Sequence, residues 1–370
     1  MNKLPLLAAL GLAACSSQNG QAPDNSAAVG NAAITTEATM AANAAATVVP
    51  EAAPPKPGEL KTFKDWIVGC DNLLTCTMAS LGPDGGDFPV ITLAISRDAG
   101  PSGGWRIAVQ VNETGDKPPA PIAAIAVDNS ETAIVHDDAV GGTAAAALIA
   151  AAANGNAITL QDKSGGTVET IALAGASAAL RYIDAMQRRT DTVTAVVARG
   201  TRPASSVPAA PAIPMIAALD PSGAAASLSA KQVVDLRSAG SCDDSAGDGT
   251  PEYHALGGGK TLVLLPCSAG AYNVTSNLYI IADGVVAPAK LDAPSGFGPG
   301  DGGTPGVVNG DFDKGVLTSY AKGRGLGDCG SEQRFVWDGD RFHLSEQADM
   351  GECRGNPNYI TTWRAHVLRR

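Results

Sequence analysis

Residues Tyr320–Gly330 read Y-A-K-G-R-G-L-G-D-C-G, and a second stretch, Met350–Gly355, reads M-G-E-C-R-G. Between them, the aromatic segments Phe335–Trp337 and Phe342–Leu344 flank the tight turn Asp338–Asp340. Apolar segments on both sides of a D-G-D turn predict a β-hairpin with a small core of its own. Because a cysteine lies beyond the outer end of each arm, we expect a disulfide to staple this hairpin.

The cysteine pattern predicts an oxidising compartment. The chain has seven cysteines, of which six lie beyond residue 60. An even number in an exported chain indicates disulfides, and six cysteines allow 15 pairings. No pair has the C-x-x-C spacing of a zinc or thioredoxin-type site, so we expect neither a metal nor a cofactor. Proximity along the chain favours the pairs Cys70–Cys76, Cys242–Cys267 and Cys329–Cys353.

The N-terminus has the pattern of a secretion signal. Lys3 precedes a short apolar run, and Leu12-Ala13-Ala14-Cys15 follows it. Small residues before a cysteine resemble a bacterial lipobox, in which the peptide is cut before the cysteine and the thiol is acylated. We therefore expect a signal peptide over residues 1–14 and a lipid on Cys15. An ordinary signal peptide, or a misassigned start codon, is the alternative interpretation.

A lipid anchor is the membrane contact that the sequence predicts. Acyl chains contribute roughly 0.8 kcal/mol per buried CH₂, and no other segment approaches the ~20 apolar residues of a membrane-spanning helix. Residues 15–60, rich in Ala, Asn, Thr and Pro, predict a disordered stalk. The folded part is expected to face the periplasm. The residue after Cys15 is Ser16 and not Asp, which favours delivery to the outer membrane.

The length of the chain indicates its domain organisation, and its charge limits the classes of partner. The chain has 370 residues, which is more than one core usually spans, and residues 201–214 contain four prolines. We therefore expect a first domain over residues 61–200, a linker over 201–214 and a second domain over 215–370. The net charge of −11 and the pI near 4.8 argue against a nucleic-acid partner.

The first domain has mainly strand patterns. In Trp105–Asn112, the residues Trp105, Ile107, Val109 and Val111 share one face. A strand, a turn and a second strand are expected within residues 63–76. Further strands are expected over residues 90–97, 105–112, 122–127, 132–136, 157–161, 168–173 and 193–199.

Two helices are expected among these strands. Thr143 is suited to cap an Ala-rich helix that ends at Ala153. Residues 175–189 have helical spacing, with an apolar face and the polar residues Arg181, Asp184, Arg188 and Arg189 outside it. Strands with a few helices predict an α+β domain built on an antiparallel sheet.

The second domain is expected to have the same α+β character. A helix is expected over residues 227–238, and strands over 261–266, 277–282 and 359–365. The glycines at 257–259 indicate a hairpin turn. Residues 296–310 are rich in Gly, Pro and Asp and predict an exposed loop. The fold class that follows is two antiparallel-sheet α+β domains, stapled by disulfides.

The chain resembles the domain of unknown function 1176 family of exported proteobacterial proteins. The resemblance is carried by R-G-L-G-D-C-G at residues 324–330, by W-D-G at 337–339 and by C-R-G at 353–355. The D-W-x-V-x-C-D-N opening at residues 65–72 and A-L-R-Y-I-D-A-x-Q at 179–187 also match it. They further suggest a distant similarity to the invasion-associated locus B family. The resemblance implies an envelope location and a disulfide-stapled fold, and it transfers no catalytic residue.

No catalytic motif appears in the sequence. Gly-x-Ser-x-Gly and H-E-x-x-H are absent, and His254 occupies the first glycine position of a phosphate loop ahead of Lys260. The most distinctive polar set is Arg324, Asp328 and Arg354, beside the expected Cys329–Cys353 bridge. If this bridge forms, Asp328 and Arg354 flank it and can pair, and a guanidinium there can bind an anionic group. We favour the alternative, which is a structural ion pair that organises the glycine-rich turns.

We therefore expect a cell-envelope lipoprotein that acts as a binding or interaction module, such as an inhibitor or an assembly factor, with an envelope protein or a glycan as partner. A cell-wall or glycan-directed hydrolase is the alternative. A pocket with two facing carboxylates and a raised pKa would favour the hydrolase. An exposed apolar or aromatic patch without titratable neighbours would favour the binding module.

Overall fold

The computed structural model describes residues 53–370 except 87, 113–118, 129–130, 247–248, 297 and 299–302. The expected signal peptide, Cys15 and the stalk up to residue 52 lie outside the described residues. From residue 53 onward, the described chain belongs to one compact unit by its contacts. The division into domains over 61–200 and 215–370 stays a prediction. Among the described residues, no helix combines the length and the apolar character that crossing a membrane requires.

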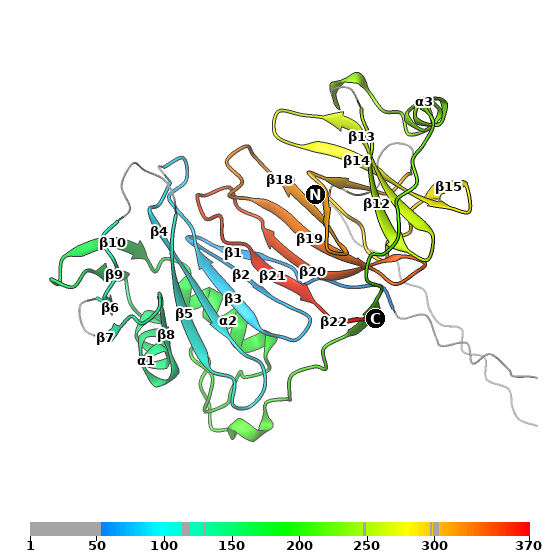
Figure 1. Ribbon diagram of the computed structural model, residues 1–370. Helices are drawn as coiled ribbons and strands as arrows, with labels where there is room; N and C mark the ends of the chain where they lie inside the picture. The colour runs from blue at the N-terminus through cyan, green and yellow to red at the C-terminus, as the bar shows by residue number, and fades with distance from the viewer. Residues whose placement is uncertain are drawn as a thin grey trace, which may run out of the picture. The chain divides into compact units, whose positions relative to one another are not determined.

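A six-stranded antiparallel sheet comes first, in the order β1-β2-β3-β4-β5-β8 (Figure 1). Its strands are β1 (Lys61–Phe63), β2 (Trp66–Cys70), β3 (Cys76–Ser80), β4 (Ile91–Arg97), β5 (Trp105–Val111) and β8 (Ala139–Gly141). The alternation predicted for β5 is confirmed at Trp105, Ile107 and Val109, which are buried. Val111 is half exposed because the strand ends there.

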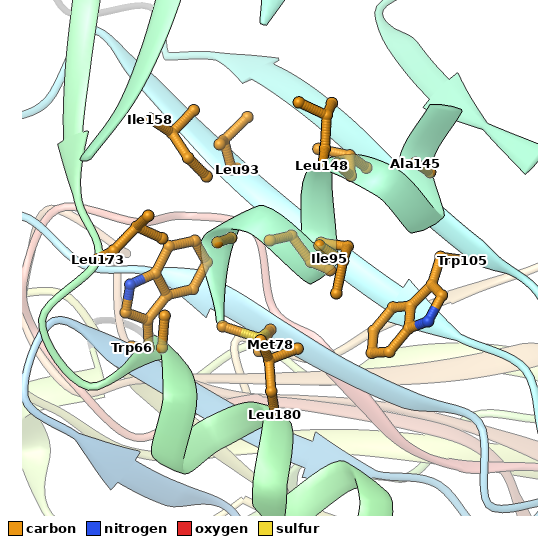
Figure 2. Packing of buried hydrophobic residues seen from close by; sticks show 14 of the residues in the cluster. Trp66, Met78, Leu93, Ile95, Trp105, Ala145, Leu148, Ile158, Leu173 and Leu180 are labelled. Atoms are coloured by element: carbon orange, nitrogen blue, oxygen red, sulfur yellow. The ribbon is translucent and has the colours of Figure 1, made fainter. Parts of the chain in front are cut away.

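A four-stranded antiparallel sheet follows, in the order β10-β9-β6-β7. Its strands are β6 (Ala124–Val127), β7 (Glu131–Ile134), β9 (Ala157–Gln161) and β10 (Thr167–Ala172). Both sheets share one apolar core with the helices α1 (Gly142–Ala152) and α2 (Ala176–Met186). Figure 2 shows side chains of this core, among them Trp66, Leu148 and Leu180, which come from β2, α1 and α2. The expected antiparallel α+β character of this half is confirmed.

Helix α2 begins where the backbone demands glycine. Gly175 has a φ of 92°, and a Cβ there would lie 1.8 Å from the Phe63 carbonyl oxygen. This close approach places the first turn of α2 against the end of β1. The apolar face predicted for α2 is confirmed, since Ala176, Ala179, Leu180 and Ile183 are buried.

Three local predictions in this half are wrong. Helix α1 is preceded by Gly141, so Thr143 lies inside the helix and does not cap it. Asp184 and Arg189, expected outside α2, are fully buried. Residues 193–199 form turns and bends, without a strand. Residues 193–199 do not form a strand because the Asp184 carboxylate of α2 accepts the Val196 and Val197 N–H groups, at 2.8 and 3.0 Å.

The rest of the chain forms two five-stranded antiparallel sheets around a second core. One contains β12 (Glu252–Gly257), β13 (Lys260–Ala269), β14 (Val274–Ala282), β15 (Val285–Pro288) and β16 (Gly306–Val308). The other contains, in order, β17 (Asp311–Asp313), β18 (Val316–Lys322), β19 (Gly330–Trp337), β20 (Phe342–Met350) and β21 (Ile360–Arg364). The predicted aromatic hairpin is confirmed as β19–β20, and its Phe335, Trp337 and Phe342 are buried in this core.

Shorter elements complete this half. The helix α3 (Ala230–Ala239) begins after Ser229, which forms a capping box with Gln232. The strand β11 (Met215–Ala218) pairs in parallel with β22 (His366–Arg369), and η1 (Ala204–Ser206) and η2 (Asp244–Ala246) are short 3₁₀ turns. The exposed loop expected over residues 296–310 is partly wrong. Its end is β16, whose Val307 and Val308 are buried because they pair with β14.

The disulfide prediction is confirmed. The structure joins Cys70 to Cys76, Cys242 to Cys267 and Cys329 to Cys353. A small third core holds the two halves of the described chain together, because Ile67 and Ala79 of the first sheet pack with Met350 and Ile360 of β20 and β21. Figure 1 shows β21 beside the first sheet. This contact positions the loops around Cys329 and Cys353 at the junction.

Candidate functional site

The loop between β18 and β19 is closed by an internal ion pair. Arg324 binds Asp328 through two hydrogen bonds, of which Nε to Oδ1 is 2.6 Å long. Asp328 is fully buried and also accepts the Gly355 N–H at 2.7 Å. Burial alone would raise the pKa of Asp328, but the hydrogen bonds from Arg324 and Gly355 outweigh it and lower the pKa. The carboxylate is therefore charged and committed to the loop.

The same loop is held from three further sides. Gly323 donates its N–H to the Cys329 carbonyl at 2.8 Å, next to the disulfide. The hydroxyls of Tyr320 and Tyr359 both donate to the Gly327 carbonyl, at 2.8 and 3.2 Å. Gly327 has a φ of 71°, and a Cβ there would lie 2.6 Å from the Tyr320 hydroxyl. A side chain at this position is excluded both by conformation and by space.

An apolar side chain lies at the end of this rigid loop. Leu326 is 65% exposed, between two glycines. Tyr272, from the turn between β13 and β14, donates to the Gly323 carbonyl at 3.2 Å and packs beside Gly325. Tyr272 itself is partly exposed. We call Lys322, Arg324, Leu326 and Tyr272 the tip surface.

The tip surface carries positive charge. The Lys322 ammonium lies 5.3 Å from the centre of the Tyr320 ring, and among the described residues it has no carboxylate partner. Arg324 is partly exposed in spite of its pairing with Asp328. This local charge is opposite in sign to that of the whole chain, which is −11.

Arg354 has a different role from the other two candidate residues. Its guanidinium donates to the Gly82 carbonyl at 2.7 Å, to the Lys64 carbonyl at 2.6 Å and to Asp65 Oδ1 at 2.7 Å. Arg354 and Asp328 do not pair with each other, because Asp328 is taken by Arg324 and by the neighbouring Gly355 N–H. The three residues predicted from the sequence thus form two separate ion pairs, and that of Arg354 joins the two halves of the described chain.

A groove of about 480 Å³ opens beside this contact. We call it the junction groove. It is lined mainly by apolar residues of the β3–β4 connection and by four consecutive residues of β10, together with two carboxylates. Leu81, Pro83, Phe88, Pro89, Val90, Ile91, Ile171, Asp65 and Glu169 are among the lining residues. Phe88 also connects the groove to the tip surface, since the Arg324 guanidinium lies 5.9 Å from its ring centre.

A second, smaller cavity of about 240 Å³ lies over β18, β19 and β20 and contains Glu332 and Glu346. Burial raises the pKa of Glu332, and the negative charge of Glu346 adds to this, while Arg334 opposes it. Arg334 Nε lies 3.7 Å from Glu346 Oε2. This cavity has features that we associate with a hydrolase, namely two carboxylates in one cavity and a raised pKa at Glu332.

Sequence reasoning did not single out several of these residues. Tyr272, Phe88 and Glu169 come from segments remote in sequence from the tip loop, and no local pattern connects them with it. Leu326 had a signal, since a large apolar residue between two glycines cannot be buried by its own neighbours. Among the described residues, no group of His, Cys, Asp and Glu is arranged to hold a metal ion.

Comparison with known proteins gives a family but no activity. The family described as "Protein of unknown function (DUF1176)" matches residues 60–366. The uncharacterized protein YpfG of Escherichia coli (strain K12) is 30% identical over 336 residues, which cover 82% of this chain and 92% of YpfG. No solved structure matches the chain. The match spans both halves of the described fold together with the tip loop, and the chain therefore belongs to the DUF1176 family.

Proposed function

We propose that this protein is a binding module of the cell envelope that inserts its tip surface into a concave site of a partner enzyme. The observation that carries this proposal is Leu326, a large apolar side chain exposed at the end of a loop that is rigidly held. A loop that is already ordered loses little conformational entropy on binding, so the buried apolar surface contributes more of its free energy to affinity. Natural inhibitors with exposed, rigid loops use this principle.

The charge distribution supports a wall-degrading glycan hydrolase as the partner. The catalytic cleft of such an enzyme contains two carboxylates, to which the Lys322 ammonium is complementary, whereas Asp328 compensates the charge of Arg324. An enzyme that acts on anionic wall polymers also needs a cationic surface, which the net charge of −11 attracts at long range. An acidic body with a cationic tip suits both requirements. An envelope assembly factor is the other role of the same class.

The location belongs to the same proposal. A lipid on Cys15 anchors the protein in the outer membrane, and residues 15–60 hold the folded part away from the membrane, on the periplasmic side. The three disulfides support an oxidising compartment of this kind. The lipid is then the membrane contact, and the tip surface is free to meet a partner in the periplasm.

An inhibition assay tests the proposed function. The mature protein is added to a c-type lysozyme and to a lytic transglycosylase that degrade purified peptidoglycan, and the release of soluble fragments is measured. We expect inhibition of at least one enzyme, and Leu326→Asp is expected to weaken it about 30-fold, as for an interface residue worth about 2 kcal/mol.

Val285→Asp is the matched control. The exposure of Val285, 67%, is close to that of Leu326, but Val285 lies beyond the opposite end of β14 from Tyr272. It is expected to inhibit as the wild type does. If Leu326→Asp and the wild type inhibit equally, the tip surface is not the contact. If neither enzyme is inhibited, the role of an inhibitor of wall hydrolases is wrong.

The cavity with Glu332 favours a second candidate function, a glycan-directed hydrolase. A carboxyl group with a raised pKa is suited to donate a proton to a glycosidic oxygen, and a second carboxylate is suited to activate water or to attack the sugar. We expect Glu332→Gln to abolish the release of reducing ends from peptidoglycan if this role is correct. Glu252→Gln, at an exposed position outside the cavity, is the control. Activity that survives Glu332→Gln rules this candidate out.

A further inference from the structure

The strand β10 has a free edge. Within the described part of the chain, it is the terminal strand of its sheet and pairs with β9 alone. Ala157 of β9 directs its N–H and carbonyl toward Asp128, at 3.0 and 3.1 Å, so its partner Ala172 directs its own groups away from β9. Because these directions alternate from one residue to the next along a strand, Thr170, two residues before Ala172, also directs its N–H and carbonyl away from β9.

Two hydrogen bonds confirm this direction. The Ala172 carbonyl accepts the indole N–H of Trp66 at 3.0 Å, and the Thr170 N–H donates to the Glu169 carboxylate at 2.9 Å. Trp66 belongs to β2 and the Glu169 carboxylate is a side-chain group, so neither bond is a backbone bond of the β9–β10 ladder. Glu169, Thr170, Ile171 and Ala172 also line the junction groove, so the free edge borders this groove.

The Glu169 carboxylate occupies a hydrogen-bonding position that an added strand would use. It accepts the outward N–H of Thr170, which is the position in which an added strand would place a backbone carbonyl. An incoming carbonyl that takes over this hydrogen bond releases the carboxylate. The released carboxylate is then free to pair with a basic side chain of the incoming segment.

The groove favours a basic and partly apolar occupant. Among the described residues, its lining includes two carboxylates and no Lys or Arg, and Arg354 neutralises one of the carboxylates, Asp65. Asp84, on the adjoining turn, is almost fully exposed, although Arg354 Nε lies 3.3 Å from its Oδ1. Leu81, Val90 and Ile171 offer an apolar floor to alternate side chains of an extended chain.

We propose that the junction groove binds an extended, basic segment of another polypeptide, which adds to β10 as a further strand. Two other occupants have the wrong charge. Residues 16–52 of this chain contain Asp24, Glu37 and Glu51 and no Lys or Arg. A second copy that pairs edge to edge through β10 brings Glu169 against another Glu169. This inference does not rest on the inhibitor role of the tip surface.

Binding to defined peptides tests the proposal. The probes are arrayed hexapeptides of the form Thr-Xaa-Lys-Xaa-Thr-Xaa, in which each Xaa is Val, Ile, Leu, Phe or Tyr, and a second array has Glu in place of Lys. We expect full-length protein to bind members of the Lys array and to bind the corresponding Glu peptides at least 10-fold more weakly. Glu169→Lys is expected to reverse this preference, because it changes the charge of the groove.

Asp235→Lys, which makes the same charge change on the exposed surface of α3, is the control and is expected to keep the preference for Lys. Hydrogen exchange then tests the strand. With the tightest peptide of the Lys array, exchange at the Thr170 and Ala172 amides is expected to slow at least 10-fold. The proposal is overturned if neither array binds, if Lys and Glu peptides bind alike, if Glu169→Lys leaves the preference unchanged, or if binding leaves both amides unprotected.

Discussion

A cluster of charged side chains lies in the interior of the first half of the chain. Arg97 and Arg189 are almost completely buried, and the fully buried carboxylate of Asp184 acts electrostatically on both. Arg97 Nη1 lies 3.2 Å from Asp184 Oδ1, and Arg189 donates to the Asp98 and Gly100 carbonyls. Burial, together with the charge of Arg189, lowers the pKa of Arg97 to about 10, although Asp184 opposes this change. Asp184 therefore compensates positive charge that solvent does not reach.

Replacement of this carboxylate is expected to be strongly destabilising. Asp184→Asn removes the negative charge, and it leaves two buried guanidinium groups without a counter-ion. We expect the free energy of unfolding to fall by about 3–5 kcal/mol, as when one member of a buried ion pair is removed. Urea unfolding followed by circular dichroism measures this loss.

Asp235→Asn provides the comparison, because Lys231 and Asp235 form an exposed pair on α3. It is expected to change the free energy of unfolding by less than about 1 kcal/mol. Equal effects of the two substitutions would mean that burial of the Asp184 cluster does not determine its contribution.

At the scale of elements, one histidine joins a connection to a hairpin. His343 of β20 lies 2.8 Å from Asp292 Oδ2 through Nδ1 and 2.8 Å from Asp338 Oδ2 through Nε2. Asp292 belongs to the connection after β15, and Asp338 to the turn of the β19–β20 hairpin. The hydrogen bond to Asp292 raises the pKa of His343, the bond to Asp338 adds to this, and partial burial opposes it. The imidazolium thus links the two segments.

The stability of the fold is expected to depend on pH through His343. Its pKa is raised on folding, so its contribution is fully present below the unfolded value of about 6.5 and is lost as the pH rises through the folded value. We expect the wild-type urea midpoint to fall between pH 6 and pH 9. His343→Gln is expected to lower stability by about 2 kcal/mol at pH 6, and to flatten this dependence, because glutamine does not titrate.

His254→Gln is the control, since its partner Glu252 is mostly exposed. This variant is expected to keep the pH dependence of the wild type. A His343→Gln protein whose midpoint still falls as the wild-type midpoint does would show that other groups cause the dependence.

At the scale of the whole molecule, long-range hydrogen bonds hold the described chain together. Arg354 reaches three acceptors next to β2 and β3, and Asn356 donates to the Ser80 carbonyl at 2.8 Å. Asn72 exchanges two hydrogen bonds with the Arg364 backbone, at 3.0 and 2.9 Å. These polar contacts surround the small apolar core that Ile67 forms with Ile360. Asp65, Ser80 and Gly82, which accept the hydrogen bonds of Arg354 and Asn356, also line the junction groove.

Arg354→Ala is expected to loosen this junction. It leaves the Gly82 and Lys64 carbonyls and Asp65 without their donor, so we expect a loss of about 3 kcal/mol in the free energy of unfolding. Arg354→Lys keeps the charge without the planar fork, and it is expected to recover only part of this loss. Urea unfolding measures both, and hydrogen exchange is expected to accelerate at the Gly82 amide, which donates to the Arg354 carbonyl.

Arg334→Ala is the matched control, because Arg334 pairs with Glu346 at an exposed position. Its effect on stability is expected to stay below about 1 kcal/mol. If Arg354→Ala is equally mild, the junction is held by its apolar core and not by this guanidinium.

Parts of this fold could be predicted from local patterns, and the same patterns failed where distant groups decide. Trp105, Ile107 and Val109 identified β5 correctly, because a strand buries every second residue whatever its neighbours are. Asp184 and Arg189 were expected outside α2, because helical spacing alone cannot show that Arg97 lies opposite. The candidate residues Arg324, Asp328 and Arg354 show the same limit. Arg324 and Asp328 are four positions apart in the sequence, whereas Arg354 pairs with Asp65, 289 positions away.

The sequence by itself determined the antiparallel α+β character, the aromatic hairpin and the three disulfides, because each follows from spacing within about 25 residues. Tertiary structure alone decided that Tyr272 and Phe88 meet the tip loop, that β16 is buried, and that β10 borders a groove. The physical reason is that burial and charge compensation depend on which surfaces are brought together in space. A local pattern records which face of an element is apolar, but not which partner covers it.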